Sequence, residues 1–336
     1  MNWKPNRRSL IKAGLATAAF GGLSPLAFAD DLPAKPEAGG IKMGLNPWLG
    51  YGQWHIANKK GMFKAQGLDS VELVNFTTDS DLNAALASGQ LQCGNIATHT
   101  AMNFMAAGLP IKIVLLLDIS KTADAMISDG SITDIKGLKG KPVALEEGTT
   151  SDILLNYALA ANGMTIADVQ KVPMPAADAG SALIAGKVPV AVTYEPYLTI
   201  AMQQNKAVKM IYSAGEDPGL ISDVLVVTDD FLKNKPGQIV ALVKAWGAAV
   251  DDYRADTKGG RAIISEAVGA KPDELTTAFD GVVYYSLSEN KQELHGNFVS
   301  KVIPDVHAAA RKAGILQKDV DLSQAIDTRF VDAAAK

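Results

Sequence analysis

The apolar and polar positions of this 336-residue chain follow one pattern twice. An apolar helix end, a glycine and a short apolar strand occur over Ala85–Asn95 and recur over Ala182–Val192, 97 residues later. The same offset aligns the apolar run Ile111–Val114 with Val208–Ile211. Each copy has the pattern of a helix, a glycine turn, a strand, a second helix and a second strand. The repeat therefore predicts two similar α/β lobes, and we expect the function to lie in the cleft between them.

Strand and helix patterns alternate through the first third of the chain. Strands are predicted at four apolar or alternating runs, namely Ile41–Leu45, Leu68–Phe76, Leu91–Ile96 and Ile111–Leu117. The last run is almost wholly apolar, which is typical of a strand buried on both faces. Gly89 and Gly108 follow helical patterns and fit helix ends. This order predicts a mainly parallel sheet covered by helices.

A second series of strands follows, and the chain then returns. Further strands are predicted at Ala125–Ile127, Val143–Leu145, Val169–Val172 and Val224–Thr228, and the chain after Phe231 has a mostly helical pattern. We expect one lobe from residues 40–118 and 225–336, and a second, inserted lobe from residues 120–220. The chain would cross between the lobes near 118–124 and near 215–224. Two crossing segments form a hinge, which lets a cleft close on a ligand.

Residues 1–29 have the features of an export signal. The pair Arg7 and Arg8 precedes a mildly apolar run, Ala13–Phe28, and Ala27-Phe28-Ala29 fits a small-x-small cleavage site. The paired arginines favour the twin-arginine route, and an ordinary signal with adjacent arginines by chance is the alternative. The run is short and contains glycines, so it is a poor membrane span. We expect cleavage after residue 29 and a soluble periplasmic protein.

Charge and cysteine content exclude several classes of function. Removal of residues 1–29 takes away four basic and no acidic residues and moves the formal charge from −4 to −8, which disfavours nucleic-acid binding. Cys93 is the only cysteine, so neither an internal disulfide nor a cysteine-based metal site can form. The four histidines have no metal-motif spacing. We therefore expect neither a metal nor a cofactor.

Hydrogen-bond donors gather where predicted strands lead into predicted helices. In parallel α/β lobes, ligands bind beyond the carboxyl ends of the strands, next to helix N-termini. Thr98 and His99 lie at one such junction, and Thr149, Thr150 and Ser151 lie at another. Their side chains and the free N–H groups of the helix ends would favour an anion. The alternative is that these residues only cap helices.

Aromatic and acidic residues lie at further junctions. Trp48 lies in a loop between Pro47 and Gly50, where core packing is not expected, and would form an apolar wall of a pocket. Asp118 ends a predicted buried strand, Glu195 follows the strand of the second repeat, and Asp223 lies at the return crossing. Carboxylates there would select an amino, amidinium or amide donor. The alternative for Asp118 and Asp223 is that they accept hydrogen bonds within the hinge.

Catalytic motifs are missing from the sequence. The stretch Gly180–Val188 lacks the spacing and the Ser or Thr of a phosphate loop, and no G-x-S-x-G sequence occurs. Cys93 lies in a predicted buried strand, which favours an inert thiol. His99 has no recognisable nucleophile to activate. We therefore expect a binding protein and not an enzyme, with a periplasmic enzyme as the less favoured alternative.

Four short segments of the sequence resemble segments of the periplasmic solute-binding proteins of ABC importers. Within these proteins they resemble the NMT1-like group for nitrate, taurine, aliphatic sulfonates and thiamine-pyrimidine precursors. They are Ala57–Leu68, Ala85–Gly89, Ile135–Lys141 and Ala191–Tyr197. The resemblance implies a type II periplasmic-binding-protein fold of two Rossmann-like α/β lobes. It also implies a binder that delivers its ligand to a membrane permease and its ATPase. The cysteine-rich motif of the family's pyrimidine-synthesising branch is absent from this chain.

The resemblance also bears on the ligand. Sulfonate and nitrate members of the family present donors at positions like Thr98 and 149–151, and this chain adds carboxylates around them. A taurine-type or aliphatic-sulfonate ligand is therefore expected, and a zwitterion fits best, with its sulfonate at the helix ends and its ammonium at Glu195 or Asp223. A small cationic or urea-like nitrogen compound, or a pyrimidine, is the alternative. We expect a monomer, and a role in signalling instead of transport stays open.

Overall fold

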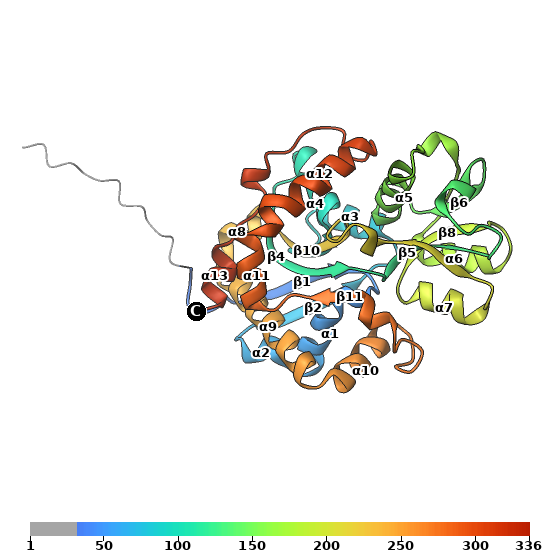
Figure 1. The fold of residues 1–336 in the computed structure, drawn as a ribbon. Coiled ribbons are helices and arrows are strands. Elements are labelled where there is room, and N and C mark those ends of the chain that lie inside the picture. Colours follow the sequence, from blue (N-terminus) through green and yellow to red (C-terminus); the bar gives the residue numbers. More distant parts are fainter. Residues whose placement is uncertain (1–31) are drawn as a thin grey trace, which may run out of the picture. The chain divides into compact units, whose positions relative to one another are not determined.

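Two β-sheets organise residues 32–336, which are the residues that this computed structural model describes (Figure 1). The predicted signal peptide, residues 1–29, lies outside the described residues. The larger sheet has the strand order β11 (Val282–Tyr284), β4 (Ile111–Ser120), β10 (Ser222–Thr228), β3 (Cys93–Ala97), β1 (Gly40–Leu45), β2 (Ser70–Asn75). The smaller sheet has the order β7 (Gln170–Pro173), β6 (Pro142–Leu145), β8 (Val190–Tyr194), β5 (Asp124–Ser128), β9 (Lys209–Ser213).

The two sheets are built alike. In the larger sheet β1 pairs in parallel with β2 and β3, and the antiparallel strand β10 lies between β3 and β4. In the smaller sheet β6 pairs in parallel with β7 and β8, and the antiparallel strand β5 lies between β8 and β9. Thus β2, β1, β3, β10 and β4 correspond in order and direction to β7, β6, β8, β5 and β9. The predicted repeat and the expected two-lobed α/β fold are confirmed.

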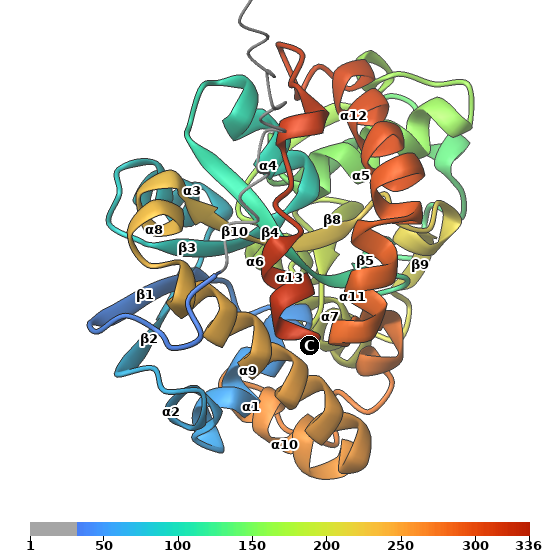
Figure 2. The ribbon, with the colours of Figure 1, turned by 90° about the vertical axis from the view of Figure 1, so that its left-hand side faces the viewer.

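Helices cover both sheets. In chain order they are α1 (Gly52–Lys59), α2 (Met62–Ala65), α3 (Asp79–Ala87), α4 (Thr98–Ala106), α5 (Thr150–Ala161), α6 (Ala176–Ile184), α7 (Tyr197–Gln204), α8 (Asp229–Asn234), α9 (Pro236–Ala255), α10 (Thr257–Ala267), α11 (Leu287–Leu294), α12 (Ile303–Lys312) and α13 (Arg329–Ala334). Of the helices in residues 32–336, none combines the length and the apolar character that a membrane span requires. The 20-residue helix α9 lies against α1, α10, α11 and α13 (Figure 2).

The repeated stretches end one helix and begin one strand in each lobe. In the first copy α3 ends before Gly89, and in the second α6 ends before Gly186. Both glycines have positive φ angles, 75° and 70°, which residues with a β-carbon rarely adopt. The glycine at this place in each copy is therefore needed to end the helix and turn the chain into β3 or β8.

The C-terminal part departs from the prediction of mostly helical structure. The strand β11 was not expected, and it pairs antiparallel with β4 so that Tyr284 lies opposite Asp118. Residues 272–277 form turns instead of a helix, and a π-helical turn, Phe298–Val302, precedes α12. A three-residue strand is too short to show a period of two, which is why the pattern missed it.

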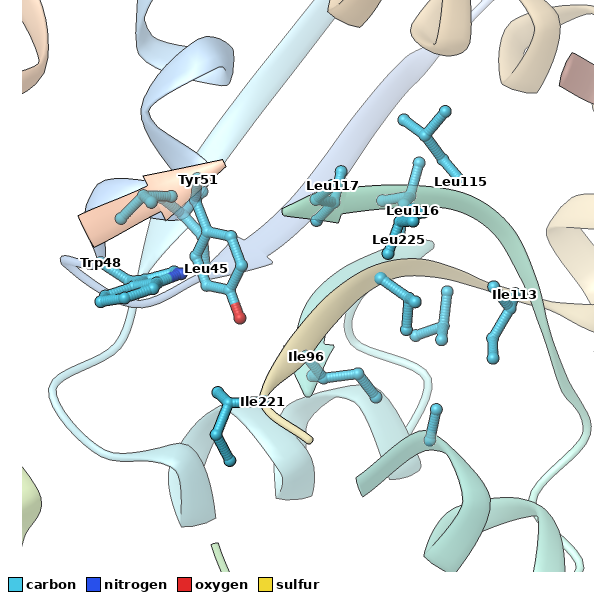
Figure 3. Packing of buried hydrophobic residues seen from close by; sticks show 14 of the residues in the cluster. Leu45, Trp48, Tyr51, Ile96, Ile113, Leu115, Leu116, Leu117, Ile221 and Leu225 are labelled. Carbon is cyan, nitrogen blue, oxygen red and sulfur yellow. The ribbon is translucent and has the colours of Figure 1, made fainter. Parts of the chain in front are cut away.

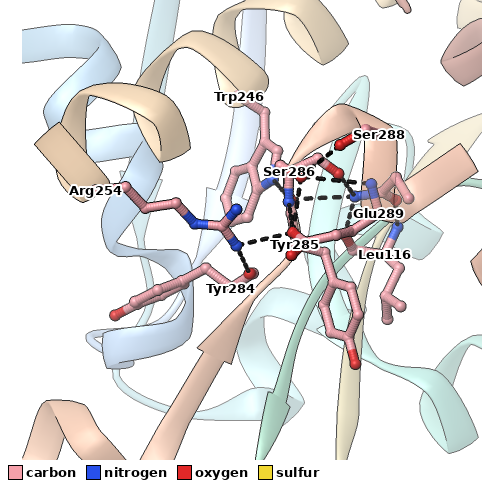
Figure 4. Close-up of polar contacts among 9 residues, drawn as sticks. Leu116, Trp246, Arg254, Tyr284, Tyr285, Ser286, Ser288 and Glu289 are labelled. Atoms are coloured by element: carbon pink, nitrogen blue, oxygen red, sulfur yellow. Dashed lines mark hydrogen bonds and ion pairs between the residues drawn. The ribbon is translucent and has the colours of Figure 1, made fainter.

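Polar contacts fix β11 and the start of α11 (Figure 4). Ser286 and Glu289 form a capping box, in which each side chain bonds to the main-chain N–H of the other residue. The guanidinium of Arg254 donates to the carboxylate of Glu289 at 2.8 Å and to the carbonyl oxygen of Tyr284 at 3.0 Å. These bonds fix β11, which is the edge strand of the larger sheet beside β4. They also support the loop around Trp48, since the Tyr284 hydroxyl donates to the carbonyl oxygen of Leu49 at 2.9 Å.

The core lies along the central strands of the larger sheet. Leu115, Leu116 and Leu117 of β4 pack beside Leu225 of β10 (Figure 3), and all four side chains are fully buried. Trp54 is fully buried. Its ring centroid lies 4.9 Å from that of Trp246, and its indole N–H donates to Asn95 Oδ1 at 2.7 Å. A smaller apolar cluster lies between β5, β8 and α6 in the other lobe.

Candidate functional site

Strand ends and helix starts from both sheets surround one cavity. About 510 Å³ of space lies between its wall atoms, part of it open to solvent. From the larger sheet and its helices the wall contains Asn46, Trp48, Tyr51, Asp79, Asn83, Ile96, Ala97, Thr100, Ile221 and Asp223. From the smaller sheet and its helices it contains Asp124, Thr149, Thr150, Ser151, Ala176 and Tyr194. The cavity therefore lies where the sequence placed the cleft, at the carboxyl ends of the parallel strands.

Five of the nine predicted ligand-binding residues line this cavity, namely Trp48, Thr149, Thr150, Ser151 and Asp223. Thr149 also caps α5: its hydroxyl donates to the carbonyl oxygen of Glu146 at 2.9 Å and accepts from the N–H of Ser151 at 3.4 Å. The two interpretations of this junction are thus compatible, because the capping residue is also on the cavity wall. The start of α5 therefore lies at the cavity, where the positive end of the helix dipole would stabilise an anionic group.

Thr98 and His99 are buried behind the wall. The hydroxyl of Thr98 bonds to Ser222: its oxygen lies 3.0 Å from the Ser222 carbonyl oxygen and 2.8 Å from Ser222 Oγ. Burial lowers the pKa of His99 to about 4, although a hydrogen bond to the main chain of Thr149 acts in the opposite direction. His99 on α4, which packs on the larger sheet, thus lies beside the start of α5, which packs on the smaller one. The ring is also within hydrogen-bond distance of its neighbour, with 3.4 Å between His99 Nε2 and Thr100 Oγ1.

Asp118 and Asp223 form a buried carboxyl pair across β4 and β10. The indole N–H of Trp48 donates to Asp118 Oδ1 at 3.3 Å, and the hydroxyl of Tyr51 donates to Asp223 Oδ1 at 3.1 Å. Burial and the charge of Asp223 raise the pKa of Asp118 well above its ordinary value. Burial raises the pKa of Asp223 to about 6, against the lowering effect of its bonds to Tyr51, Asp118 and Trp48. Burial and the closeness of the two carboxyl groups therefore favour a protonated form of the pair.

Glu195 is buried and is absent from the cavity wall. Its carboxylate accepts from the N–H of Thr199 at 3.0 Å and from the hydroxyl of Thr199 at 2.8 Å. Burial raises the pKa of Glu195 to about 7, and the bonds from Thr199 oppose this. In this structure the carboxylate of Glu195 therefore bonds to the first turn of α7 and does not face the cavity.

The expectation that Trp48 would stay out of the core is wrong. Its side chain is only 5% exposed, and it belongs to the main apolar cluster while it also lines the cavity. Its ring meets that of Tyr194 edge to face, with centroids 5.8 Å apart, and lies beside Tyr51 (Figure 3). Tyr194 in turn contacts Tyr197 at 5.4 Å. The loop residue is buried because the second lobe supplies an aromatic partner, which a local pattern cannot show.

Several polar wall residues are not among the nine predicted ones, and Asn46, Asp79 and Asp124 are three of them. Burial, then the charges of Glu146 and Asp223, raise the pKa of Asp79 to about 7. Burial, then the charge of Asp223, raises the pKa of Asp124 well above its ordinary value. Asn46 directly follows β1 and Asp79 begins α3, so the rule applied to the other strand ends would have found both.

Two sheets with corresponding strand orders, joined by two crossings and enclosing a cavity at their strand ends, define the two-lobed periplasmic-binding-protein class. The chain belongs to the NMT1/THI5-like family, whose sequence model matches residues 52–258. The chain spans 56% of the length of the first curated relatives that it matches, which are named putative binding proteins.

Named relatives and solved structures agree with this class. The chain is 23% identical to the taurine-binding periplasmic protein of Escherichia coli over 82% of this chain and 88% of that one. The fold matches that of the alkanesulfonate-binding protein of Xanthomonas axonopodis pv. citri bound to MOPS, with a TM-score of 0.71 and 16% identity over 88% of this chain and 99% of that one. It also matches a desulfurization enzyme, with a TM-score of 0.64 and 13% identity over 88% and 98%. The fold by itself therefore leaves binding and catalysis open.

Proposed function

We propose that this chain is the periplasmic substrate-binding component of an ABC importer. It captures a small organic nitrogen or sulfur compound between its lobes and delivers it to a permease that works with its ATPase. The observation that carries the proposal is that the cavity wall is made by strand ends and helix starts of both lobes. A ligand there contacts both lobes at once, so its binding favours their closure.

The proposed movement uses the two crossing segments as a hinge. The lobes are residues 40–118 with 225–336, and residues 120–220, joined near 118–124 and 215–224. Tyr51 on the first lobe and Tyr194 on the second both line the cavity, and His99 bonds to the main chain of Thr149 between them. Separation of the lobes breaks that bond and exposes the cavity, and a ligand that contacts both walls holds it closed.

The proposed ligand is of the taurine or aliphatic-sulfonate type, as in the relatives' names. A sulfonate at the start of α5 meets the positive end of the helix dipole and the hydroxyls of Thr150 and Ser151. The ammonium of taurine meets the carboxyl groups on the same wall. A small cationic or urea-like nitrogen compound, or a pyrimidine, is the second candidate, and the three carboxyl groups on the wall favour it.

Two measurements test capture between lobes. A thermal-shift screen over sulfonates, amino-sulfonates, ureas, guanidines and pyrimidines should find a compound that raises the melting temperature, because a ligand stabilises the state that binds it. Small-angle scattering with the compound at saturation should then show a smaller radius of gyration. An unchanged radius at saturation contradicts closure.

The periplasmic enzyme is the rival class. An enzyme converts the compound that it binds, so mass spectrometry of a purified mixture of protein and compound would detect a product. We expect the compound to be recovered unchanged.

Export by the twin-arginine route and a monomeric state are part of the proposal. A twin-lysine replacement of Arg7 and Arg8 should abolish export if that route is used.

A further inference from the structure

We propose that the cavity selects ligands with a positively charged nitrogen, which Asp79, Asp124 and Asp223 hold beside the aromatic rings of Trp48 and Tyr194. The inference rests on the proposed capture of a small molecule in this cavity and assigns the charge of its ligand. It also assigns ligand contact to Asp79 and Asp124, at the start of α3 and of β5.

The charge balance of the wall is the first argument. Three carboxyl groups face the cavity, Asp118 lies behind Asp223, and within residues 32–336 the wall contains no lysine, arginine or histidine. None of the ion pairs formed by the described residues includes Asp79, Asp118, Asp124 or Asp223. Buried carboxylates need an opposite charge or several hydrogen bonds. A cation in the cavity supplies that charge.

The supply of hydrogen bonds is the second argument. Asp223 is bonded to Tyr51, Asp118 and Trp48. Within the described part of the chain, no hydrogen bond reaches the carboxyl group of Asp79. Its pKa is raised to about 7 by burial and by the charges of Glu146 and Asp223. A ligand N–H group beside Asp79 would both satisfy its oxygen atoms and reverse that shift.

The third argument is an unsatisfied amide on the same wall. Asn46 is only 4% exposed, lines the cavity, and its Nδ2 has no partner among the described residues. Buried amides in folded proteins are almost always bonded, so this one indicates that a polar ligand belongs beside it. A half-turn of the amide exchanges its two ends, so Asn46 can bond either a donor or an acceptor of that ligand.

Aromatic rings complete a site for a cation. Trp48, Tyr51 and Tyr194 all line the cavity, and the faces of such rings attract positive charge. An alkanesulfonate without an amino group would instead place a second negative charge among the carboxyl groups. The wall therefore favours a cation, or a zwitterion whose anionic end lies at the start of α5.

Two pairs of probes separate charge from shape. Guanidinium and urea are nearly the same size and differ in charge, and taurine and ethanesulfonate differ by the ammonium group. Titration calorimetry at pH 8 should give guanidinium at least about tenfold tighter binding than urea, and taurine at least about tenfold tighter binding than ethanesulfonate. The charge selection is overturned if urea binds as tightly as guanidinium, or ethanesulfonate as tightly as taurine. Either result leaves the proposed capture between the lobes unaffected.

Variants identify the residues. Asp79→Asn and Asp124→Asn should each weaken binding of the charged probe about tenfold or more and change binding of the neutral probe little. Asp81→Asn is the matched control, because Asp81 lies in the same helical turn and is exposed outside the wall. Melting without ligand checks that each variant folds. If no probe binds the native protein, the charge selection is overturned. The thermal-shift screen and small-angle scattering then test the proposed capture between the lobes by themselves.

Discussion

A single part-buried carboxyl group, Asp79, links the cavity to stability. In the folded protein it keeps its proton up to about pH 7, whereas an unfolded chain loses that proton near pH 4. The folded state thus binds more protons between these values, so stability falls as pH rises through that range. Asp79→Asn removes the effect and should raise the free energy of unfolding of the ligand-free protein at pH 8 by about 1–3 kcal/mol.

Thermal unfolding followed by calorimetry at several pH values, without urea or guanidinium, checks this prediction. The gain from Asp79→Asn should shrink as pH falls towards 4, because the unfolded chain also takes up a proton at this position there. Asp81→Asn should give no gain at any of these pH values. An Asp79→Asn protein that is less stable than the native protein at pH 8 would show that the carboxyl group is stabilising as it stands.

The same groups make cation binding depend on pH. Protonation of Asp79 with a pKa of about 7, and of Asp223 with a pKa of about 6, removes the charges that attract a cation. Asp79 faces Glu146 and Asp223, and Asp223 faces Tyr51, Asp118 and Trp48, so no cationic side chain of the protein offsets the effect. Affinity for guanidinium, whose charge is constant, should rise about tenfold or more from pH 5 to pH 8.

Titration calorimetry at half-unit pH steps measures this profile. His99, with a pKa of about 4, stays neutral throughout and adds nothing to it. Asp79→Asn should flatten the part of the profile near pH 7. A profile that is flat for the native protein would mean that these carboxyl groups do not contact the ligand.

The sequence located part of this site, for a physical reason. Thr149, Thr150 and Ser151 lie on the wall because they stand where a helix begins, and that rule depends only on local order. Which of the buried acids face the cavity depends on the pairing of β4 with β10, which no local pattern contains. Hence Asp118 was proposed although it lies behind Asp223, and Asp124 was missed.

At the scale of elements, the start of α5 has two roles that a pair of variants separates. Thr149→Ala removes the cap and should lower the free energy of unfolding by about 1 kcal/mol. It should also weaken taurine binding, because the frayed helix end presents its N–H groups less well. Thr228→Ala is the matched control: Thr228 caps α8, where its hydroxyl accepts from Phe231, away from the cavity wall.

Thermal denaturation measures the loss of stability of both variants, and titration calorimetry measures their affinity for taurine. Equal losses of stability, with weaker taurine binding only for Thr149→Ala, are expected. If Thr149→Ala binds taurine as the native protein does, the start of α5 does not hold the sulfonate.

The strands and helices show which structural features a sequence pattern can predict. The strand and helix order of both lobes was predicted because each copy of the repeat has its own apolar period and its own glycine. The insertion of β10 between β3 and β4 was not predicted, since it depends on where the returning chain finds an unpaired edge. The strand β11 is likewise defined by its partner β4 and by the bonds of Arg254, and not by its own three residues.

At the scale of the whole molecule, closure depends on contacts between lobes that are independent of the ligand. The approach of His99 to the main chain of Thr149 is one such contact, and His99 is neutral across the physiological range. His99→Leu keeps an apolar side chain of similar bulk and removes the bond. The open form should become more populated, and ligand affinity should fall about threefold to tenfold, which corresponds to roughly 0.6–1.4 kcal/mol.

Scattering and calorimetry on the same samples separate this effect from direct ligand contact. His99→Leu should have a larger radius of gyration than the native protein without ligand and reach the native closed radius at saturation, because the ligand still contacts both walls. His295→Gln is the control: His295 bonds to Asp332 on the surface, and its loss should change neither quantity. If His99→Leu has native affinity and radius, the bond does not favour closure, and the balance between open and closed forms is set by the crossing segments alone.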